Sequence, residues 1–246
     1  MRSSEQVTSG FPTRASAWKG EVIALIGRNG SGKTTLGKVL AGLIPCRDGR
    51  FVVAGSQVRQ KRLSDYAYFV MQEADHQLYK ESAVEELRLG NERASDIDER
   101  IAGILDMLNL TDFAQHHPYA LSGGQKQRLT IGTAMASSKP IVVLDEATAF
   151  VDPENEQRMS LAIREIIAGK TVIVIAHKLR SIAGADKIIM LHQGRVLAEG
   201  TQGELLSSCP EYRALWDASE QVSGWTLRDG GRVDAQGARG GEALSC

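Results

Sequence analysis

A glycine-rich stretch near the start of the chain, GRNGSGKT at residues 27–34, has the residue types needed to hold phosphate groups. It matches the pattern G-x-x-x-x-G-K-[ST]. Glycines let a loop turn tightly so that its backbone N–H groups converge on phosphate oxygens, and a following helix points its positive end at the same anion. Lys33 would reach the outer phosphates of a nucleotide, and the Thr34 hydroxyl would coordinate Mg²⁺. The alternative is a glycine-rich turn without a ligand. Because the stretch follows an apolar run and opens a helical pattern, the phosphate loop is favoured.

Two adjacent carboxylates form a second group of candidate residues. Asp145 and Glu146 follow the apolar run at residues 141–144, which predicts a buried strand. Charge at the end of such a strand is costly unless it faces a ligand. Asp145 would support the shell of the Mg²⁺ ion, and Glu146 would accept a proton from an attacking water. The alternative is a solvated acidic turn, which the phosphate loop upstream makes less favourable.

The third group is the stretch LSGGQ at residues 121–125, called the signature stretch below. Ser122 and Gln125 have the spacing of a capping box, which is sufficient to start a helix. A capping box does not explain the two consecutive glycines between them. These glycines leave backbone N–H groups open at a helix N-terminus, so the stretch predicts a second anion site.

Apolar runs and helical periodicities alternate around these groups. The predicted strands are residues 21–26, 50–54, 66–71, 141–144 and 171–176, with a hairpin made by 188–191 and 195–198. The predicted helices are residues 33–43, 82–89, 97–110, 122–138, 153–168 with Asp152 as its cap, and a short helix opened by the capping box at 201–204. This alternation predicts an α/β fold with a mostly parallel central sheet that binds ligands at the carboxyl ends of its strands.

The bulk composition sets limits on the function. The 246 residues allow one large domain or two small ones, and the net charge of −1 gives no electrostatic reason to expect nucleic acid as a partner. The three cysteines lie far apart and fit no metal-ligand spacing, which favours a reducing compartment. The first twenty residues lack the apolar core of a signal peptide, and no apolar run approaches the ~20 residues that cross a bilayer. If the protein works at a membrane, we expect another polypeptide to supply the span.

Together the three stretches resemble the defining motifs of the ATP-binding-cassette (ABC) family, in the same order and at suitable separations. Gln72 matches the family's Q-loop glutamine, Asp152 its D-loop aspartate and His177 its switch histidine. For His177 alone, a structural histidine is the alternative interpretation. The resemblance covers about residues 19–217, and it implies a P-loop NTPase fold with a helical signature subdomain at about 73–138. Residues 1–18 are then a divergent or disordered leader. Residues 218–246 are predicted to be a disordered tail, with six glycines between 224 and 241.

The resemblance also implies a head-to-tail dimer in which ATP on one protomer's phosphate loop meets Ser122, Gly124 and Gln125 of the other. Glu146 would be the catalytic base, His177 would hold the γ-phosphate and the attacking water, and Gln72 would touch Mg²⁺ or the water. The implied ligands of Mg²⁺ are Thr34, Gln72 and, through water, Asp145. The implied nucleotide-binding residues are Asn29, Gly30, Ser31, Gly32, Lys33, Thr34, Thr35, Asp145 and Asp152, with Ser122, Gly124 and Gln125 from the second protomer.

The function that the resemblance implies is that of the ATP-binding and ATP-hydrolysing subunit of an ABC transporter. Such a subunit lies on the cytoplasmic face of the cell membrane, bound to integral membrane subunits and to a second ATPase subunit, identical or different. A soluble ABC ATPase outside transport is the alternative. Residues 71–79 (MQEADHQLY) and 84–86 (VEE) look like energy-coupling-factor importers, whereas residues 145–156 (DEATAFVDPENE) and 175–179 (IAHKL) look like exporter-type cassettes. Import and export therefore both stay open.

The segment ahead of the phosphate loop departs from the family pattern. Family members usually carry two strands and an adenine-stacking aromatic there, and only 26 residues precede Gly27 in this chain. Phe11 and Trp18 are the available aromatics, and neither has the usual spacing. The sequence leaves open whether either of them stacks on the base, an interaction worth ~0.5–1.5 kcal/mol beyond burial.

Overall fold

The computed structural model describes residues 4–5, 16–46, 49–92, 94–146, 162–163, 165–166, 169–176, 179–182 and 184–223. Phe11, Asp152, His177 and the chain from residue 224 onward lie outside this part of the structure. Most of the helix predicted at 153–168 lies outside it as well. Among the described residues, no helix combines the length and the apolar character that a membrane span requires.

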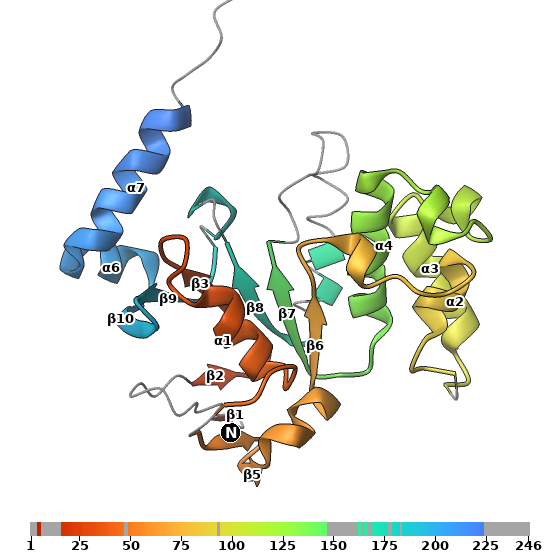
Figure 1. Cartoon of the computed structure of the whole chain (residues 1–246), viewed down its shortest axis with the longest axis horizontal. Coiled ribbons are helices and arrows are strands. Elements are labelled where there is room, and N and C mark those ends of the chain that lie inside the picture. The colour runs from red at the N-terminus through yellow and green to blue at the C-terminus, as the bar shows by residue number, and fades with distance from the viewer. Residues whose placement is uncertain are drawn as a thin grey trace, which may run out of the picture.

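A six-stranded sheet with the order β10-β9-β3-β8-β7-β6 forms the centre of the molecule (Figure 1). Neighbouring strands from β6 to β9 are parallel, and only β10 is antiparallel to its neighbour. This arrangement confirms the α/β fold with a mostly parallel sheet. Each of these strands overlaps a predicted one. Their bounds are β3 Val22–Ile26, β6 Ala67–Val70, β7 Ile141–Asp145, β8 Thr171–Ile175, β9 Lys187–His192 and β10 Arg195–Gly200.

Two small antiparallel pairs lie outside the central sheet. Strand β1 (Ser4–Glu5) pairs with β2 (Ala17–Trp18), and β4 (Phe51–Val53) pairs with β5 (Ser56–Val58). Of these four strands only β4 was predicted, because β1, β2 and β5 are too short or too polar to show a period. The leader predicted at 1–18 therefore contains paired strands at its described positions.

Helices α1, α2, α3, α4 and α6 begin within one residue of a predicted start and differ mainly in where they end, whereas α7 was not predicted. Helix α1 stops at Leu40 rather than at residue 43, because Gly42 adopts a left-handed φ of 73°. Helix α7 continues to Ser223, so the disordered tail predicted from residue 218 is wrong for residues 218–223, which precede the first glycine of the tail. The helices are α1 Lys33–Leu40, α2 Ala83–Arg88, α3 Ile97–Met107, α4 Gly123–Ala136, α6 Gln202–Ser208 and α7 Pro210–Ser223, with short 3-10 turns η1 Gln60–Asp65, η2 Ala74–His76, η3 Thr111–Phe113, η4 Pro118–Ala120 and η5 Leu179–Ile182.

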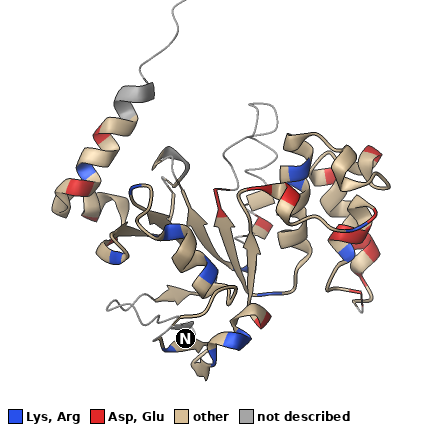
Figure 2. Cartoon of the chain, in the orientation of Figure 1, with Lys and Arg blue, Asp and Glu red and all other residues tan. Residues whose placement is uncertain are grey.

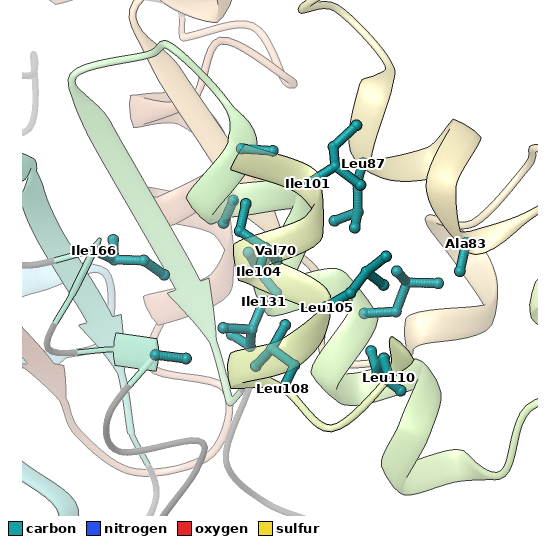
Figure 3. Close-up of a cluster of buried hydrophobic side chains, with 14 of the residues drawn as sticks. Val70, Ala83, Leu87, Ile101, Ile104, Leu105, Leu108, Leu110, Ile131 and Ile166 are labelled. Carbon is teal, nitrogen blue, oxygen red and sulfur yellow. The ribbon is translucent and has the colours of Figure 1, made fainter. Parts of the chain in front are cut away.

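The apolar stripe predicted on the helix at 97–110 packs into the core. Ile97, Ile101, Ile104 and Leu105 of α3 are buried, together with Leu108 just after it, against α2 and α4 (Figure 3). The same cluster includes Val70 of β6 and Leu144 of β7. A second cluster joins α1 to the sheet, and a third joins α6 and α7 to β3 and β9. Packing therefore fixes both α1 and α4 relative to the strand ends that carry the candidate residues.

Candidate functional site

The glycine-rich loop between β3 and α1 has a backbone that side chains would not allow. Gly27 has a φ of 144°, and a Cβ placed on it would lie 2.2 Å from the carbonyl oxygen of Leu191 in β9. Gly32, at the N-cap of α1, has a φ of 98° and makes no side-chain cap. The first N–H groups of α1 therefore have no capping side chain on them and point out of the helix end, as an anion site requires.

Lys33 places a positive charge inside this loop. Its side chain is almost buried, and its Nζ donates hydrogen bonds to the carbonyls of Gly27 at 2.9 Å and Arg28 at 3.2 Å. Burial lowers the pKa of Lys33, while the charges of Glu146 and Asp145 oppose that shift. A buried ammonium that donates to two neutral carbonyls can be stabilised further by an anion in the loop.

Ser31 shows where the loop lacks a partner. The residue is 5% exposed, and within the described part of the chain its hydroxyl oxygen has no hydrogen-bond partner. Its carbonyl accepts a hydrogen bond of 2.9 Å from the N–H of Gly194, in the turn between β9 and β10, which braces the loop from the far side. The buried cation, the unpartnered hydroxyl and the open helix end together fit a polyphosphate. Asn29, Gly30 and Thr35 are exposed around them.

Asp145, the last residue of β7, is brought against the phosphate loop. Its Oδ1 accepts a hydrogen bond of 3.1 Å from the Thr34 hydroxyl, across 111 positions of sequence. Asp145 is 3% exposed, and burial raises its pKa, reinforced by Glu146 and opposed by the Thr34 hydrogen bond, Lys38 and Lys33. A carboxylate and a hydroxyl in contact are hard oxygen ligands of the kind that Mg²⁺ prefers, so this pair fits the expected ion.

Glu146 leaves the sheet in an unusual backbone conformation. Its φ is 51°, in the left-handed region, and its N–H donates to the carbonyl of Ile175 in β8 at 3.1 Å. For a residue other than glycine this conformation is costly, and such residues cluster at functional sites. The side chain is half-exposed at the carboxyl edge of the sheet.

Gln72 lies at the same edge. Strand β6 pairs Val70 with Leu144 in parallel register. Gln72 lies two residues after Val70 and Glu146 two residues after Leu144, so both follow neighbouring strands at the same edge. Gln72 is exposed. The structure therefore brings the phosphate loop, Asp145, Glu146 and Gln72 to one edge, whereas the placement of Asp152 and His177 stays a prediction.

The signature stretch is not at that site within one chain. Both halves of the predicted capping box are present: the Ser122 N–H donates to Gln125 Oε1 at 2.7 Å, and the Gln125 N–H donates to Ser122 Oγ at 3.3 Å. Figure 1 shows the N-terminal end of α4 beyond β7 and β6, on the other side of the sheet from the loop ahead of α1. Ser122, Gly124 and Gln125 are thus kept from their own chain's phosphate loop.

Trp18 lies at the opposite end of β3 from the phosphate loop. Its carbonyl accepts a hydrogen bond of 3.0 Å from the Thr171 hydroxyl, at the first residue of β8. The loop begins after the last residue of β3, so the length of that strand, ~16 Å, separates the two. The Trp18 backbone therefore lies a strand length from the phosphate loop, so its stacking on adenine is not supported by this geometry, and Phe11 lies outside the described residues.

A mostly parallel α/β sheet with a phosphate loop after β3 and an acidic pair at the end of β7 defines a P-loop nucleotide-binding protein. A family model described as ABC transporter matches residues 13–149. The chain belongs to the ABC transporter family and carries its ATP-binding domain. The resemblance in the motifs is therefore confirmed at the level of the family.

Three relatives illustrate the similarity. The mycobactin import ATP-binding/permease protein IrtA of Mycolicibacterium thermoresistibile is 38% identical over 83% of this chain and 24% of its own length. The energy-coupling factor transporter ATP-binding protein EcfA1 of Bacillus licheniformis is 35% identical over 76% of this chain and 70% of its own length. A bacterial Atm1-family ABC exporter with ATP bound is similar in structure, with a TM-score of 0.75 and 25% identity over 89% of this chain and 42% of that one. The chain thus spans about a quarter of the length of IrtA and most of EcfA1.

We expect that Asp145→Asn lowers Mg²⁺-dependent ATP hydrolysis at least ~10-fold, because a neutral amide binds the ion's shell more weakly.

The same change should raise the thermal stability of the nucleotide-free protein. The folded pKa of Asp145 is raised, so its contribution to stability is fully present below the unfolded pKa and is lost as pH rises through the folded value. Unfolding midpoints measured between pH 4 and pH 8 should therefore depend less on pH in the variant. A nucleotide-free variant less stable than the wild type at pH 8 would contradict this.

Proposed function

We propose that this chain binds Mg-ATP on the loop at residues 27–35 and hydrolyses it in a head-to-tail dimer, and that this hydrolysis drives transport through separate membrane subunits. The observation that carries the proposal is that two buried groups of the phosphate loop could each bind an oxygen of a ligand. The Lys33 ammonium is buried and donates to two backbone carbonyls, and the buried Ser31 hydroxyl has no partner in the described structure. Triphosphate oxygens would give the Lys33 ammonium an anionic partner and would accept a hydrogen bond from the Ser31 hydroxyl.

The Mg²⁺ ion would be held by the Thr34 hydroxyl, by Gln72 and, through water, by Asp145. When bound, it would neutralise charge that develops on the phosphate oxygens. The contribution of the chain is to hold Thr34 and Asp145 together before the ion arrives, as their 3.1 Å contact does.

Glu146 would take the proton of the attacking water. It lies one residue beyond the proposed ion-binding carboxylate, and its side chain is half-exposed, so a water can reach it. His177 would hold the γ-phosphate and the water, and Asp152 would complete the nucleotide site. Both assignments rest on the sequence motifs.

A second protomer would close the site. Within one chain, the N-terminal end of α4 lies beyond β7 and β6, away from the phosphate loop (Figure 1), and the glycines after Ser122 leave a helix start open to a ligand. A second copy turned head to tail would bring that helix start over the nucleotide, where its N–H groups and positive helix end favour a phosphate.

The edge strand β6 offers a place for a membrane subunit. A pocket of about 360 Å³ is lined by residues from the segment just after α1, from β6, from the region of α2 and from the segment after α4. Three apolar residues that line it, Leu43, Tyr79 and Leu89, are 49%, 73% and 47% exposed. Large apolar side chains gathered around a pocket favour a protein partner over solvent. Together with relatives whose names describe transport, this supports transport over the soluble alternative and a position at the cytoplasmic face of a membrane.

The test of the transport part is assembly. The tagged chain should co-purify from detergent-solubilised membranes with an integral membrane protein, and Tyr79→Ser with Leu89→Ser should weaken that association without changing Mg-ATP binding. A chain that instead purifies with ribosomes or DNA and without a membrane partner would support the soluble alternative.

A further inference from the structure

An unbroken chain of hydrogen bonds runs from the segment after β6 into the middle of α4. The Met71 N–H donates to Gln77 Oε1 at 2.9 Å, and Gln77 Nε2 donates to the Tyr68 hydroxyl at 3.0 Å. The Tyr68 hydroxyl donates to Thr133 Oγ1 at 2.9 Å, and the Thr133 hydroxyl donates to the carbonyl of Thr130 at 2.7 Å. Backbone next to Gln72 is therefore linked to the helix that begins at the signature stretch.

Every link in this chain is directional. Burial raises the pKa of Tyr68, so its hydroxyl stays protonated and remains a donor to Thr133. Because each group accepts one bond and donates the next, the links polarise one another. Losing one hydroxyl would leave a neighbouring polar group unpaired in a mostly buried place, so the chain has one favoured arrangement.

A second tether joins the same two parts nearer the signature stretch. Lys126, on the first turn of α4, pairs with Asp75 of η2 at 2.6 Å, and the Lys126 side chain is only 15% exposed. Its ammonium also lies 5.5 Å from the centre of the Tyr119 ring, just ahead of the signature stretch. Figure 2 shows basic and acidic residues close together where the segment after β6 passes α4. The segment from Met71 to Gln77 is therefore joined to α4 at two places, at Lys126 in the first turn and at Thr133 further along the helix.

We propose that Gln77 and Tyr68 are positioning residues that lock the backbone of Gln72 to α4, so that the helix presenting the signature stretch decides where Gln72 stands at its own protomer's nucleotide. This inference rests on the proposed function, which gives Gln72 its role. Gln72 is exposed, so its place is set mainly through its backbone, and the Met71–Gln77 bond holds that backbone. When a second protomer's nucleotide shifts α4, these hydrogen bonds carry the shift to Gln72.

Two substitutions that each remove one hydroxyl from this series of hydrogen bonds test the positioning role. Tyr68→Phe removes only the hydroxyl at the centre of the chain, and Thr133→Val removes the next hydroxyl with little change of shape. Each should lower kcat for Mg-ATP hydrolysis about fivefold to tenfold with less than a twofold change in KM, because misplacement of a positioning group acts on the reacting complex. Tyr66→Phe, one residue before β6 and outside the chain of hydrogen bonds, is the matched control and should leave both constants unchanged.

The decisive measurement is a double-mutant cycle, in which the kcat of Tyr68→Phe is compared in the wild-type and in the Gln72→Ala background. If Tyr68 acts through Gln72, Tyr68→Phe should have no further effect on kcat there, whereas any loss of thermal stability should be equal in both backgrounds. Equal losses of kcat in both backgrounds, or no loss in either, would overturn the proposal. A Gln72→Ala variant with wild-type kcat would overturn it too, together with the role of Gln72. Hydrolysis itself is tested separately by variants of Lys33 and Glu146, which lie outside the chain of hydrogen bonds.

Discussion

Glu146→Gln is expected to stop ATP turnover while leaving ATP binding intact. Glutamine has the same shape but cannot take a proton from water, and general-base catalysis contributes ~10²–10⁴-fold to rates. We therefore expect steady-state hydrolysis to fall by roughly 10³-fold. The backbone should tolerate the change, since the hydrogen bond from residue 146 to Ile175 involves only main-chain atoms.

The same variant should accumulate a dimer in the presence of Mg-ATP, because the nucleotide that joins the two protomers is no longer consumed. Size-exclusion chromatography or light scattering with and without Mg-ATP measures this shift. Glu199→Gln is the matched control, since Glu199 is an exposed carboxylate on the edge strand β10. It should hydrolyse ATP at the wild-type rate and remain monomeric. Unchanged hydrolysis in Glu146→Gln would remove Glu146 as the base.

Lys33→Ala is expected to weaken ATP binding by about 100-fold or more. The wild-type ammonium is held inside the loop, and its contacts with the Gly27 and Arg28 carbonyls place it where phosphates would enter. Loss of a charge-assisted bond to an anion in a buried site costs several kcal/mol, and each 1.4 kcal/mol is a factor of ten in affinity. The effect should fall on binding, and hydrolysis should be lost with it.

Thermal unfolding gives a direct measurement of this loss. A ligand at 100 times its Kd stabilises the folded state by ~2.7 kcal/mol, so ATP should raise the unfolding midpoint of the wild type and not that of Lys33→Ala. The control is Lys61→Ala, because Lys61 is an exposed lysine in η1, away from the loop. It should keep the full shift. A normal ATP-induced shift in Lys33→Ala would show that the phosphates bind elsewhere.

Local sequence patterns predicted most of the fold. The buried strands β3, β7 and β8 and the stripe on α3 follow from runs and periods of apolar residues, which act over a few positions. The capping boxes at Ser122 and Thr201 are local in the same sense and are both present. The missed strands β1, β2 and β5 are two or three residues long, and pairing with a partner strand defines them. Helix α7 was missed as well, and it packs against the sheet through the buried Tyr212.

The end of α7 shows the limit of composition as a guide. A glycine-rich tail predicts disorder, and the prediction placed its start at residue 218. The helix continues to Ser223 because residues 218–223 contain no glycine or proline to stop it, and because its earlier turns are held by buried Tyr212. Disorder from composition is an average over a window, whereas a helix ends at particular residues.

By itself the sequence determined the phosphate loop, the acidic pair, the signature stretch and the family, because each is a short pattern whose chemistry is complete within a few residues. Only the tertiary structure placed Thr34 against Asp145, braced Ser31 with Gly194 and put Trp18 at the far edge of the sheet. It also joined Gln77, Tyr68 and Thr133 in one line. The physical reason is distance along the chain: hydrogen bonds between residues far apart in sequence exist only once strand order and helix packing have brought their atoms together.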